Sequence, residues 1–260
     1  MSLRSIFLFA AAEVARPDTG PASFAIDLAR RHGARLTAFV TALDVTTPGR
    51  DSDAGAVAAA LTEAARQAGV DCETVTQHSH AVTVHEAVCQ HARLHDLVVT
   101  GTDDGSLLSE RNIAENLLFE SGRPVVLVPA GHAAAASGSA VAVAWDSTAA
   151  AARALGDAVS LLEIENVDFV TVSGEKDLPE DLTEALLVST SARRGLRAAH
   201  RTVELGSRSI AAALQQEAQA GGTALLVMGA FGHSNLRRYV LGSATSDLLA
   251  GLAMPVLLSR

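Results

Sequence analysis

The 260-residue sequence is poor in lysine, cysteine and aromatic residues. Lysine occurs once, at Lys176, so almost all of the positive charge comes from arginine. Cys72 and Cys89 form neither a C-x2-C pair nor a multi-cysteine framework, which counts against a disulfide scaffold and indicates a reduced, cytoplasmic setting. The formal net charge of −9 counts against nucleic acid and anionic membranes as partners, because both reward clustered positive charge.

Long hydrophobic runs are also lacking, since no stretch reaches the ~18 apolar residues that a membrane span needs. Residues 6–12 follow Arg4 and have the apolar character of a short signal peptide, but Glu13 closes the stretch. The same segment is needed as the first strand of a repeated plan. We therefore expect a strand there and no export.

The motifs of several enzyme classes are absent as well. The sequence contains no G-x4-G-K-[ST] phosphate loop, and no G-x-G-x2-G opens either half. It also contains no G-x-S-x-G nucleophile elbow and no H-E-x2-H zinc motif. No residue is predicted to be a catalytic nucleophile or general base.

What is present is the same closing pattern in each half of the chain. Residues 96–101 and 225–229 are short apolar strands that end at a glycine. After each strand come a loop, a helix with a Leu-Leu pair, and a proline that opens the closing strand at 124–128 or 255–258. The matching order predicts an internal repeat.

The stretch between the halves, residues 130–139, is rich in Ala, Gly and Ser and has no strong periodicity, which is typical of a linker. We place the boundary near Gly138. The prediction is two tandem domains, one over residues 1–134 and one over residues 139–260.

Each half has a β-α-β-α-β-α-β-α-β pattern, which predicts an α/β fold with two open-sheet, Rossmann-like domains, each with a five-stranded parallel sheet. Ser147 and Ser209 are expected to cap helices. Ligands of such sheets bind beyond the carboxyl ends of the strands, where the strand order reverses. In the second half we expect strands at 140–144, 167–172, 198–203, 224–228 and 256–258, and helices at 148–162, 179–194, 209–220 and 243–252.

The loop after the fourth strand of the second half has the spacing expected of an anion site. It runs Gly, two residues, Gly, nine residues, Gly-Ser. Glycine allows close approach of the backbone to a phosphate, and a helix that begins at the last glycine offers unpaired amides. Arg237 and Arg238 would offset phosphate charge. The residues of the pattern are Gly229, Gly232, Gly242 and Ser243.

This pattern, together with the segments 227–234, 248–257 and 141–147, resembles the ATP-binding form of the universal stress protein family. The resemblance covers the whole second half, whereas in the first half it is architectural and strongest around the last two strands. The chain as a whole resembles tandem members of the family with a degenerate first half. It implies domains of the adenine nucleotide alpha hydrolase-like type.

The resemblance also implies a site and a role. The ligand would be ATP or a related adenine nucleotide, with or without Mg²⁺, and the protein would act through occupancy and an unidentified protein partner rather than by catalysis. Slow ATP hydrolysis is compatible with this role. On the phosphate and ribose side, the implied residues are Met228, Gly229, Gly232, Gly242, Ser243 and Ala244. On the adenine side, they are Trp145, Asp146 and Val172.

The first half departs from this pattern. Its glycine-to-proline distance is 23 positions, from Gly101 to Pro124, against 26 in the second half. Counted back from the proline, Arg111-Asn112 stands where Gly242-Ser243 stands in the other half. Because carboxylates repel a triphosphate, we expect no ATP there. The carboxylates near that loop are Asp103, Asp104 and Glu110.

Five histidines of the first half are weighed as metal ligands and set aside. His91 and His95 are four residues apart on a predicted helix, but no cysteine or acidic ligand stands at a diagnostic spacing. We expect a solvated or helix-terminal face and no metal. Cys89 is expected to be a small core residue. The remaining histidines are His78, His80 and His85.

Two other functions remain open. One is a nucleotide-free scaffold, in which Gly242-Ser243 merely starts a helix and Trp145 packs a strand end. The other is an adenylating enzyme, although the HIGH and SGGxDS signatures are absent. For assembly, the closing strands suggest antiparallel pairing within one chain, as an intrachain pseudo-dimer, and the sequence leaves a homodimer open as well.

Overall fold

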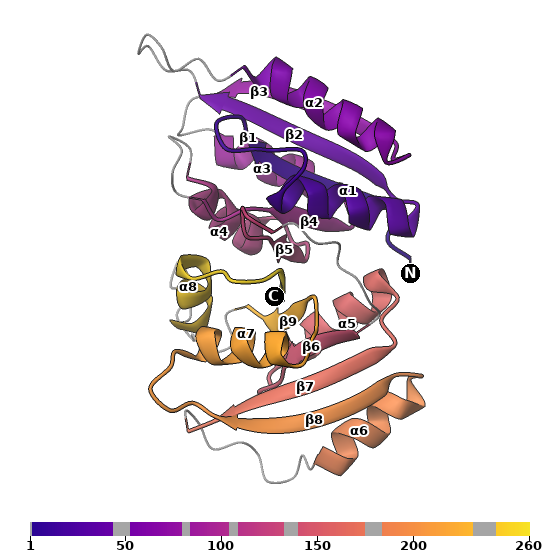
Figure 1. The fold of residues 1–260 in the computed structure, drawn as a ribbon, viewed down its shortest axis with the longest axis vertical. Coiled ribbons are helices and arrows are strands. Elements are labelled where there is room, and N and C mark those ends of the chain that lie inside the picture. Colours follow the sequence, from indigo (N-terminus) through magenta and orange to yellow (C-terminus); the bar gives the residue numbers. More distant parts are fainter. Residues whose placement is uncertain are drawn as a thin grey trace. The chain divides into compact units, whose positions relative to one another are not determined.

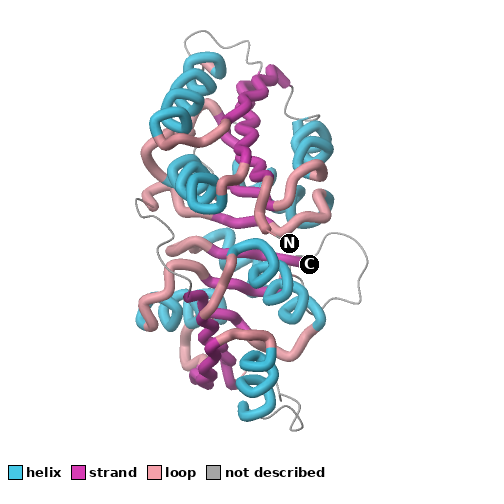
Figure 2. Tube along the Cα trace, turned by 90° about the vertical axis from the view of Figure 1, so that its right-hand side faces the viewer, coloured by secondary structure: helices cyan, strands magenta, loops and turns pink. Residues whose placement is uncertain are grey.

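The computed structural model describes residues 2–43, 53–79, 84–103, 109–132, 140–174, 184–230 and 243–260, the side chains of 43, 78, 79 and 243 excepted. The chain divides into two compact units, Met1–Ala136 and Ser137–Arg260. Each unit is an α/β domain whose helices lie on both sides of its strands (Figures 1 and 2).

The first unit contains five parallel strands in the order β3-β2-β1-β4-β5. The chain builds the sheet outward from β1 to β3 and then returns to the other side of β1 with β4. The order therefore reverses between β1 and β4. The elements are β1 (Ser5–Ala11), α1 (Gly20–His32), β2 (Arg35–Leu43), α2 (Ala54–Gln67), β3 (Cys72–Ser79), α3 (Val84–Ala92), β4 (Leu97–Thr100), α4 (Glu110–Glu120) and β5 (Val125–Leu127).

The second unit repeats this order, as β8-β7-β6-β9-β10, again with every pair parallel. Its reversal lies between β6 and β9. The predicted fold class is confirmed, and the predicted strands agree with the observed ones to within two residues. The elements are β6 (Ala140–Ala144), α5 (Ala149–Leu162), β7 (Asn166–Ser173), α6 (Glu184–Arg193), β8 (Arg197–Glu204), α7 (Ile210–Ala220), β9 (Leu226–Gly229), α8 (Ser243–Ala250) and β10 (Val256–Ser259).

The central strands are buried on both faces, which explains their unbroken apolar sequences. In β1 every residue from Ile6 to Ala11 is buried, and β4 is buried throughout. By contrast β8, at the outer side of β7, alternates between partly buried and exposed residues and carries Arg197, His200 and Arg201. A strand with only one neighbour tolerates such polar residues, and charge there discourages further pairing.

The helix starts test two capping predictions. Ser209 caps α7, because its side chain accepts a hydrogen bond from the Ala212 amide at 3.3 Å, as predicted. The prediction for Ser147 is wrong. Ser147 adopts a left-handed backbone with φ of 62°, and the next residue, Thr148, caps α5 by accepting from the Ala151 amide.

The first-strand prediction for the N-terminal segment is confirmed, since that segment forms β1 in the core of the first unit. Within the described ranges, no helix is both long and apolar enough to cross a membrane.

Candidate functional site

The carboxyl ends of β6 and β9 meet at the strand-order reversal of the second unit. The two strands pair in register, with Ala142 opposite Leu226 and Val143 opposite Val227. Continuing that register brings Trp145 level with Gly229. The sheet therefore gathers at one edge two segments that are more than 80 positions apart in the sequence, and this edge is where doubly wound sheets bind ligands.

Trp145 is fixed at this edge by its backbone and its ring. Its amide donates to the Val170 carbonyl at 2.9 Å, and its carbonyl accepts from the Thr171 hydroxyl at 2.9 Å. The indole makes an edge-on contact with Phe169 of β7, with 5.6 Å between ring centroids. The residue remains partly exposed. Packing at the end of the strand is the alternative role of this residue. The contact with Phe169 thus explains the position of part of the ring.

Asp146 organises the turn into α5. Its Oδ1 accepts from the amide of Thr148 at 3.1 Å and from the Thr148 hydroxyl at 2.6 Å. The same hydroxyl accepts from the Ala151 amide at 3.2 Å, which satisfies one free donor of the helix start. A carboxylate at this end of the helix also complements the positive end of the helix dipole. Sequence reasoning missed Thr148, because Ser147 is an equally good capping residue by type.

Gly229 closes β9 directly against the first turn of α5. A Cβ at this position would stand 2.5 Å from the carbonyl carbon of Ala150 and 2.6 Å from the amide nitrogen of Ala151. Real Cβ atoms do not approach backbone so closely, so the packing of α5 on β9 requires glycine here. This requirement holds with or without a ligand.

The remaining predicted residues of the second unit are placed as follows. Met228 is 5% exposed, so its side chain lies in the core and only its backbone faces the edge. Val172 is partly exposed near the end of β7, and Ala244 is partly exposed in the first turn of α8. Gly232 and Gly242 lie outside the described residues, as do Arg237 and Arg238, and Ser243 is described in its backbone alone.

The direction of α8 follows from its connections. It ends at Ala250, and after five intervening residues β10 begins, parallel to β9. The C-terminal end of the helix therefore lies at the amino edge of the sheet, and α8, about 12 Å long at 1.5 Å per residue, returns from the carboxyl edge. Its first amides thus begin on the side of the sheet where Trp145 and Gly229 lie.

In the first unit a buried carboxyl group occupies the corresponding edge. Glu110, the first residue of α4, is 5% exposed, and it packs so closely over Gly101 that a Cβ there would overlap its carboxylate. The Asp103 amide donates to Glu110 Oε2 at 3.3 Å, and the Glu110 amide donates to the Asp103 carbonyl at 3.0 Å. The expected carboxylates near this loop are thus present for Asp103 and Glu110, whereas Asp104 lies outside the described residues.

Burial changes the chemistry of Glu110. Loss of solvation raises the pKa of its carboxyl to about 7, against the pull of the Asp103 amide, and the nearby Asp103 charge adds to the rise. The sequence gives no sign of this, because an acidic residue beside a glycine-rich loop is normally exposed.

Two histidines of the first unit contact phenylalanines of the core. His91 packs on Phe39 with 5.0 Å between ring centroids, and His95 packs on Phe7 at 5.4 Å. Burial lowers the pKa of His95, whose Nδ1 lies 3.0 Å from the His91 carbonyl. Of the expected solvated or helix-terminal face, the helix-terminal placement agrees with the structure, since His91 lies in the last turn of α3. His95, expected on the same helix, lies beyond its end. Cys89 is buried, as predicted. In the described part of the chain, no group of three or more His, Cys, Asp or Glu side chains is arranged to hold a metal.

The burial of Glu110 predicts a pH-dependent stability difference. Its folded pKa of about 7 exceeds the ordinary value of 4.5, so the native state holds the proton more tightly and loses stability as pH rises from 4.5 to 7. Glu110→Gln removes this loss and should stabilise the protein at pH 8 by up to roughly 3 kcal/mol, with little effect at pH 4. Urea denaturation at both pH values measures it. Glu115→Gln, which removes a charge paired with Arg111 on the same helix, should not reproduce the pattern.

The contact at Gly229 predicts a packing cost without any ligand. Gly229→Ala should destabilise the protein by about 1–3 kcal/mol, because the backbone of α5 must move. The matched control is Gly156→Ala within α5, where an added Cβ meets nothing within 4 Å. That change should be neutral or stabilise by roughly 0.5–1 kcal/mol. Equal melting temperatures for Gly229→Ala and the parent protein would contradict the packing role.

Comparison with known proteins finds similarity in sequence and in fold. Residues 133–260 match the model of the Universal stress protein family. A universal stress protein from Archaeoglobus fulgidus has a similar structure, with a TM-score of 0.69, 15% identity, and coverage of 98% of this chain and 96% of that one.

Two Pseudomonas aeruginosa structures are also similar. A protein described as functionally unknown gives a TM-score of 0.64 with 15% identity over 99% of this chain and 92% of that one. A putative universal stress protein gives 0.61 with 16% identity over 99% and 93%. At these identities the likeness shows the fold alone. No curated protein matches the sequence significantly. Residues 133–260 are thus similar in sequence to the universal stress protein family, and the chain is similar in fold to the solved structures.

Proposed function

We propose that the second unit binds ATP or a related adenine nucleotide, and that the protein acts in a cytoplasmic stress response through this occupancy and a protein partner. The observation that carries the proposal is the meeting of the β6 and β9 ends at the strand-order reversal. At that edge, the partly exposed Trp145 and the carboxylate of Asp146 come together with Gly229, where the glycine-spaced loop begins.

The phosphate end of the proposed site rests on α8. The first amides of a helix carry a partial positive charge and lack internal partners, so they suit a phosphate. The connections of α8 direct its start toward the carboxyl edge. The Gly-x2-Gly-x9-Gly-Ser spacing, which ends at this helix, allows a backbone to approach phosphate oxygens.

The base end rests on the segment after β6. Trp145, directly after β6, and Val172, on the neighbouring strand β7, offer apolar surface, and both are partly exposed. Asp146 supplies a carboxylate whose orientation is fixed by Thr148 before any ligand arrives. A preoriented acceptor suits a ribose hydroxyl or an adenine amino group, because little entropy is lost on binding.

The proposal is for binding rather than turnover. Oδ1 of Asp146 is engaged by two donors of Thr148, an arrangement that favours positioning over proton transfer. Slow hydrolysis of a bound triphosphate is compatible with this account and is not needed for it.

A nucleotide-free scaffold is the rival function that one observation favours. The contact of Gly229 with Ala150 and Ala151 gives that glycine a structural reason to be present without a ligand. The same contact is compatible with a binding site. The two accounts therefore differ in whether the purified protein retains nucleotide and whether it binds added nucleotide in a titration.

Isothermal titration calorimetry with Mg-ATP tests the proposal. The expected result is one site per chain, weakened at least tenfold by Gly242→Asp, because a carboxylate in the glycine-rich turn repels phosphate. Gly131→Asp is the matched control, since it adds the same charge at an exposed position where an added Cβ meets nothing within 4 Å. Circular dichroism of each variant checks the fold.

Two results would count against nucleotide binding. One is the absence of heat together with the absence of nucleotide released on denaturing the purified protein, which would favour the scaffold. The other is undiminished affinity in Gly242→Asp. Release of pyrophosphate that depends on a second substrate would instead point to an adenylating enzyme.

A further inference from the structure

His200 lies on β8 with its ring enclosed between neighbouring elements of the second unit. Its Nε2 lies 3.1 Å from the hydroxyl oxygen of Thr171 on β7, and its Nδ1 lies 3.7 Å from Oε2 of Glu184 on α6. Figure 1 shows β7, β8 and α6 together in this unit. The imidazole is only 14% exposed, although β8 is the outer strand of the described sheet. Contacts from two neighbouring elements therefore hold the ring.

The Thr171 hydroxyl decides which ring nitrogen of His200 carries a hydrogen. Thr171 is 2% exposed, and its hydroxyl donates to the Trp145 carbonyl at 2.9 Å. A carbonyl oxygen can only accept, so the single hydroxyl hydrogen is used in that bond. The hydroxyl must therefore accept from His200, whose Nε2 carries the hydrogen. These two hydrogen bonds, which we call the Thr171 bridge, run from β8 across β7 to the end of β6.

The Thr171 bridge acts on the segment that carries the base end of the proposed nucleotide site. The peptide between Trp145 and Asp146 is planar, and its C=O and N–H point in opposite directions. By holding the Trp145 carbonyl, the Thr171 hydroxyl sets the plane of this peptide and constrains the backbone on either side of it. Hydrogen bonds in series polarise one another, so the bond from His200 strengthens the bond to the carbonyl.

The first unit has the same strand sequence without the bridge. Phe-Val-Thr occurs at 39–41 in β2 and at 169–171 in β7. The phenylalanine of this tripeptide pairs with His200 in the second unit and with Val75 in the first. Thr41 is 1% exposed, and its hydroxyl makes no hydrogen bond within the described residues. A buried threonine at this position thus does not need a histidine for the sheet to form.

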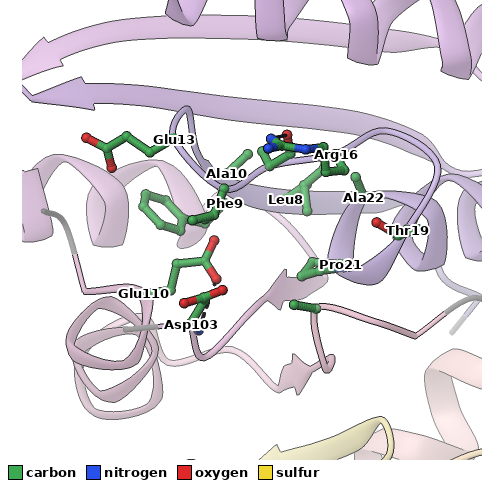
Figure 3. A pocket seen from close by; sticks show the side chains of 13 residues that line it. Leu8, Phe9, Ala10, Glu13, Arg16, Thr19, Pro21, Ala22, Asp103 and Glu110 are labelled. Carbon is green, nitrogen blue, oxygen red and sulfur yellow. Dashed lines mark hydrogen bonds between the residues drawn. The ribbon is translucent and has the colours of Figure 1, made fainter. Parts of the chain in front are cut away.

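The carboxyl edge of the first unit is also built differently. A cavity of about 250 Å³ lies there, lined by residues at the end of β1 and by Asp103 and Glu110. Figure 3 shows these two acidic side chains close together. Trp145, the only tryptophan of the chain, lies in the second unit. The bridge therefore accompanies the edge that carries the indole, which indicates a role at that edge rather than in the sheet.

We propose that Thr171 and His200 are positioning residues for the proposed nucleotide site of the second unit. His200 orients the Thr171 hydroxyl, and the hydroxyl holds the Trp145 carbonyl, which fixes the base end of the site before a ligand arrives. Neither side chain needs to touch the ligand. A preoriented site binds more tightly, because less conformational freedom is lost on binding. The inference rests on the proposed function and adds to it the residues that orient the site.

Two measurements on the full chain test the proposal. They are the emission of Trp145 without nucleotide and the Mg-ATP affinity by titration calorimetry. Thr171→Val should move the emission to longer wavelength, because the indole is held less firmly and meets more water. It should also lower the affinity about three- to tenfold, as expected for the loss of one buried hydrogen bond. Thr171→Ser keeps the hydroxyl and should restore both values.

The matched control is Thr41→Val in the first unit. It makes the same substitution at a buried hydroxyl that has no hydrogen bond in the described part of the protein, so it should change neither the emission nor the affinity. Circular dichroism checks the fold of each variant. If Thr171→Val does not fold, His200→Leu takes its place with the same direction of change, and His200→Gln, which keeps an N–H donor, should restore the parent values.

The outcomes separate this proposal from the nucleotide site itself. In a parent protein that binds Mg-ATP, parent-like emission and affinity in folded Thr171→Val would overturn the positioning role alone. A loss of affinity that Thr171→Ser does not restore would overturn it as well, because the hydroxyl would not be the cause. Absence of Mg-ATP binding in the parent protein would instead overturn the proposed function, and the positioning role with it.

Discussion

Parallel pairing of the first and fourth strands is the constraint on which the candidate site of the second unit and the equivalent edge of the first unit depend. It joins β1 to β4 in the first unit and β6 to β9 in the second. Because the first strand is central and the chain reverses direction across the sheet beside it, the loops that follow the two strands leave the sheet at the same edge. Each unit thus brings together a loop after its first strand and a loop after its fourth.

The two units use this edge differently, and the difference begins at equivalent glycines. At Gly229 the neighbour is the first turn of α5, whose cap is set by Asp146 and Thr148. At Gly101 the neighbour is the carboxyl of Glu110. The space beside Gly229 therefore holds the start of a helix, and the space beside Gly101 holds a buried carboxyl group. A shared topology has thus been fitted with different local chemistry in the two units.

The strands were predictable because their apolar runs are set by burial on both faces. Both bounds of β6 and the start of β10 agree with the prediction, and β10 extends one residue further, to Ser259. The N-cap of α5 was not predictable, since Ser147 and Thr148 both carry a hydroxyl that can cap a helix. The left-handed backbone of Ser147 decides between them. The burial of Glu110 and the packing of His91 on Phe39 depend on neighbours distant in sequence. The packing role of Gly229 was also not predictable from sequence, because its contact is with the first turn of α5, a segment distant in the sequence.

Trp145 allows the most direct test, because it is the only tryptophan in the chain and lies where the adenine is proposed to bind. Its fluorescence should be titrated with Mg-ATP, with excitation at a wavelength that adenine does not absorb. A saturable change in emission is predicted, because a bound base alters the surroundings of the exposed part of the indole. Emission that stays constant up to millimolar Mg-ATP would contradict nucleotide binding at the end of β6.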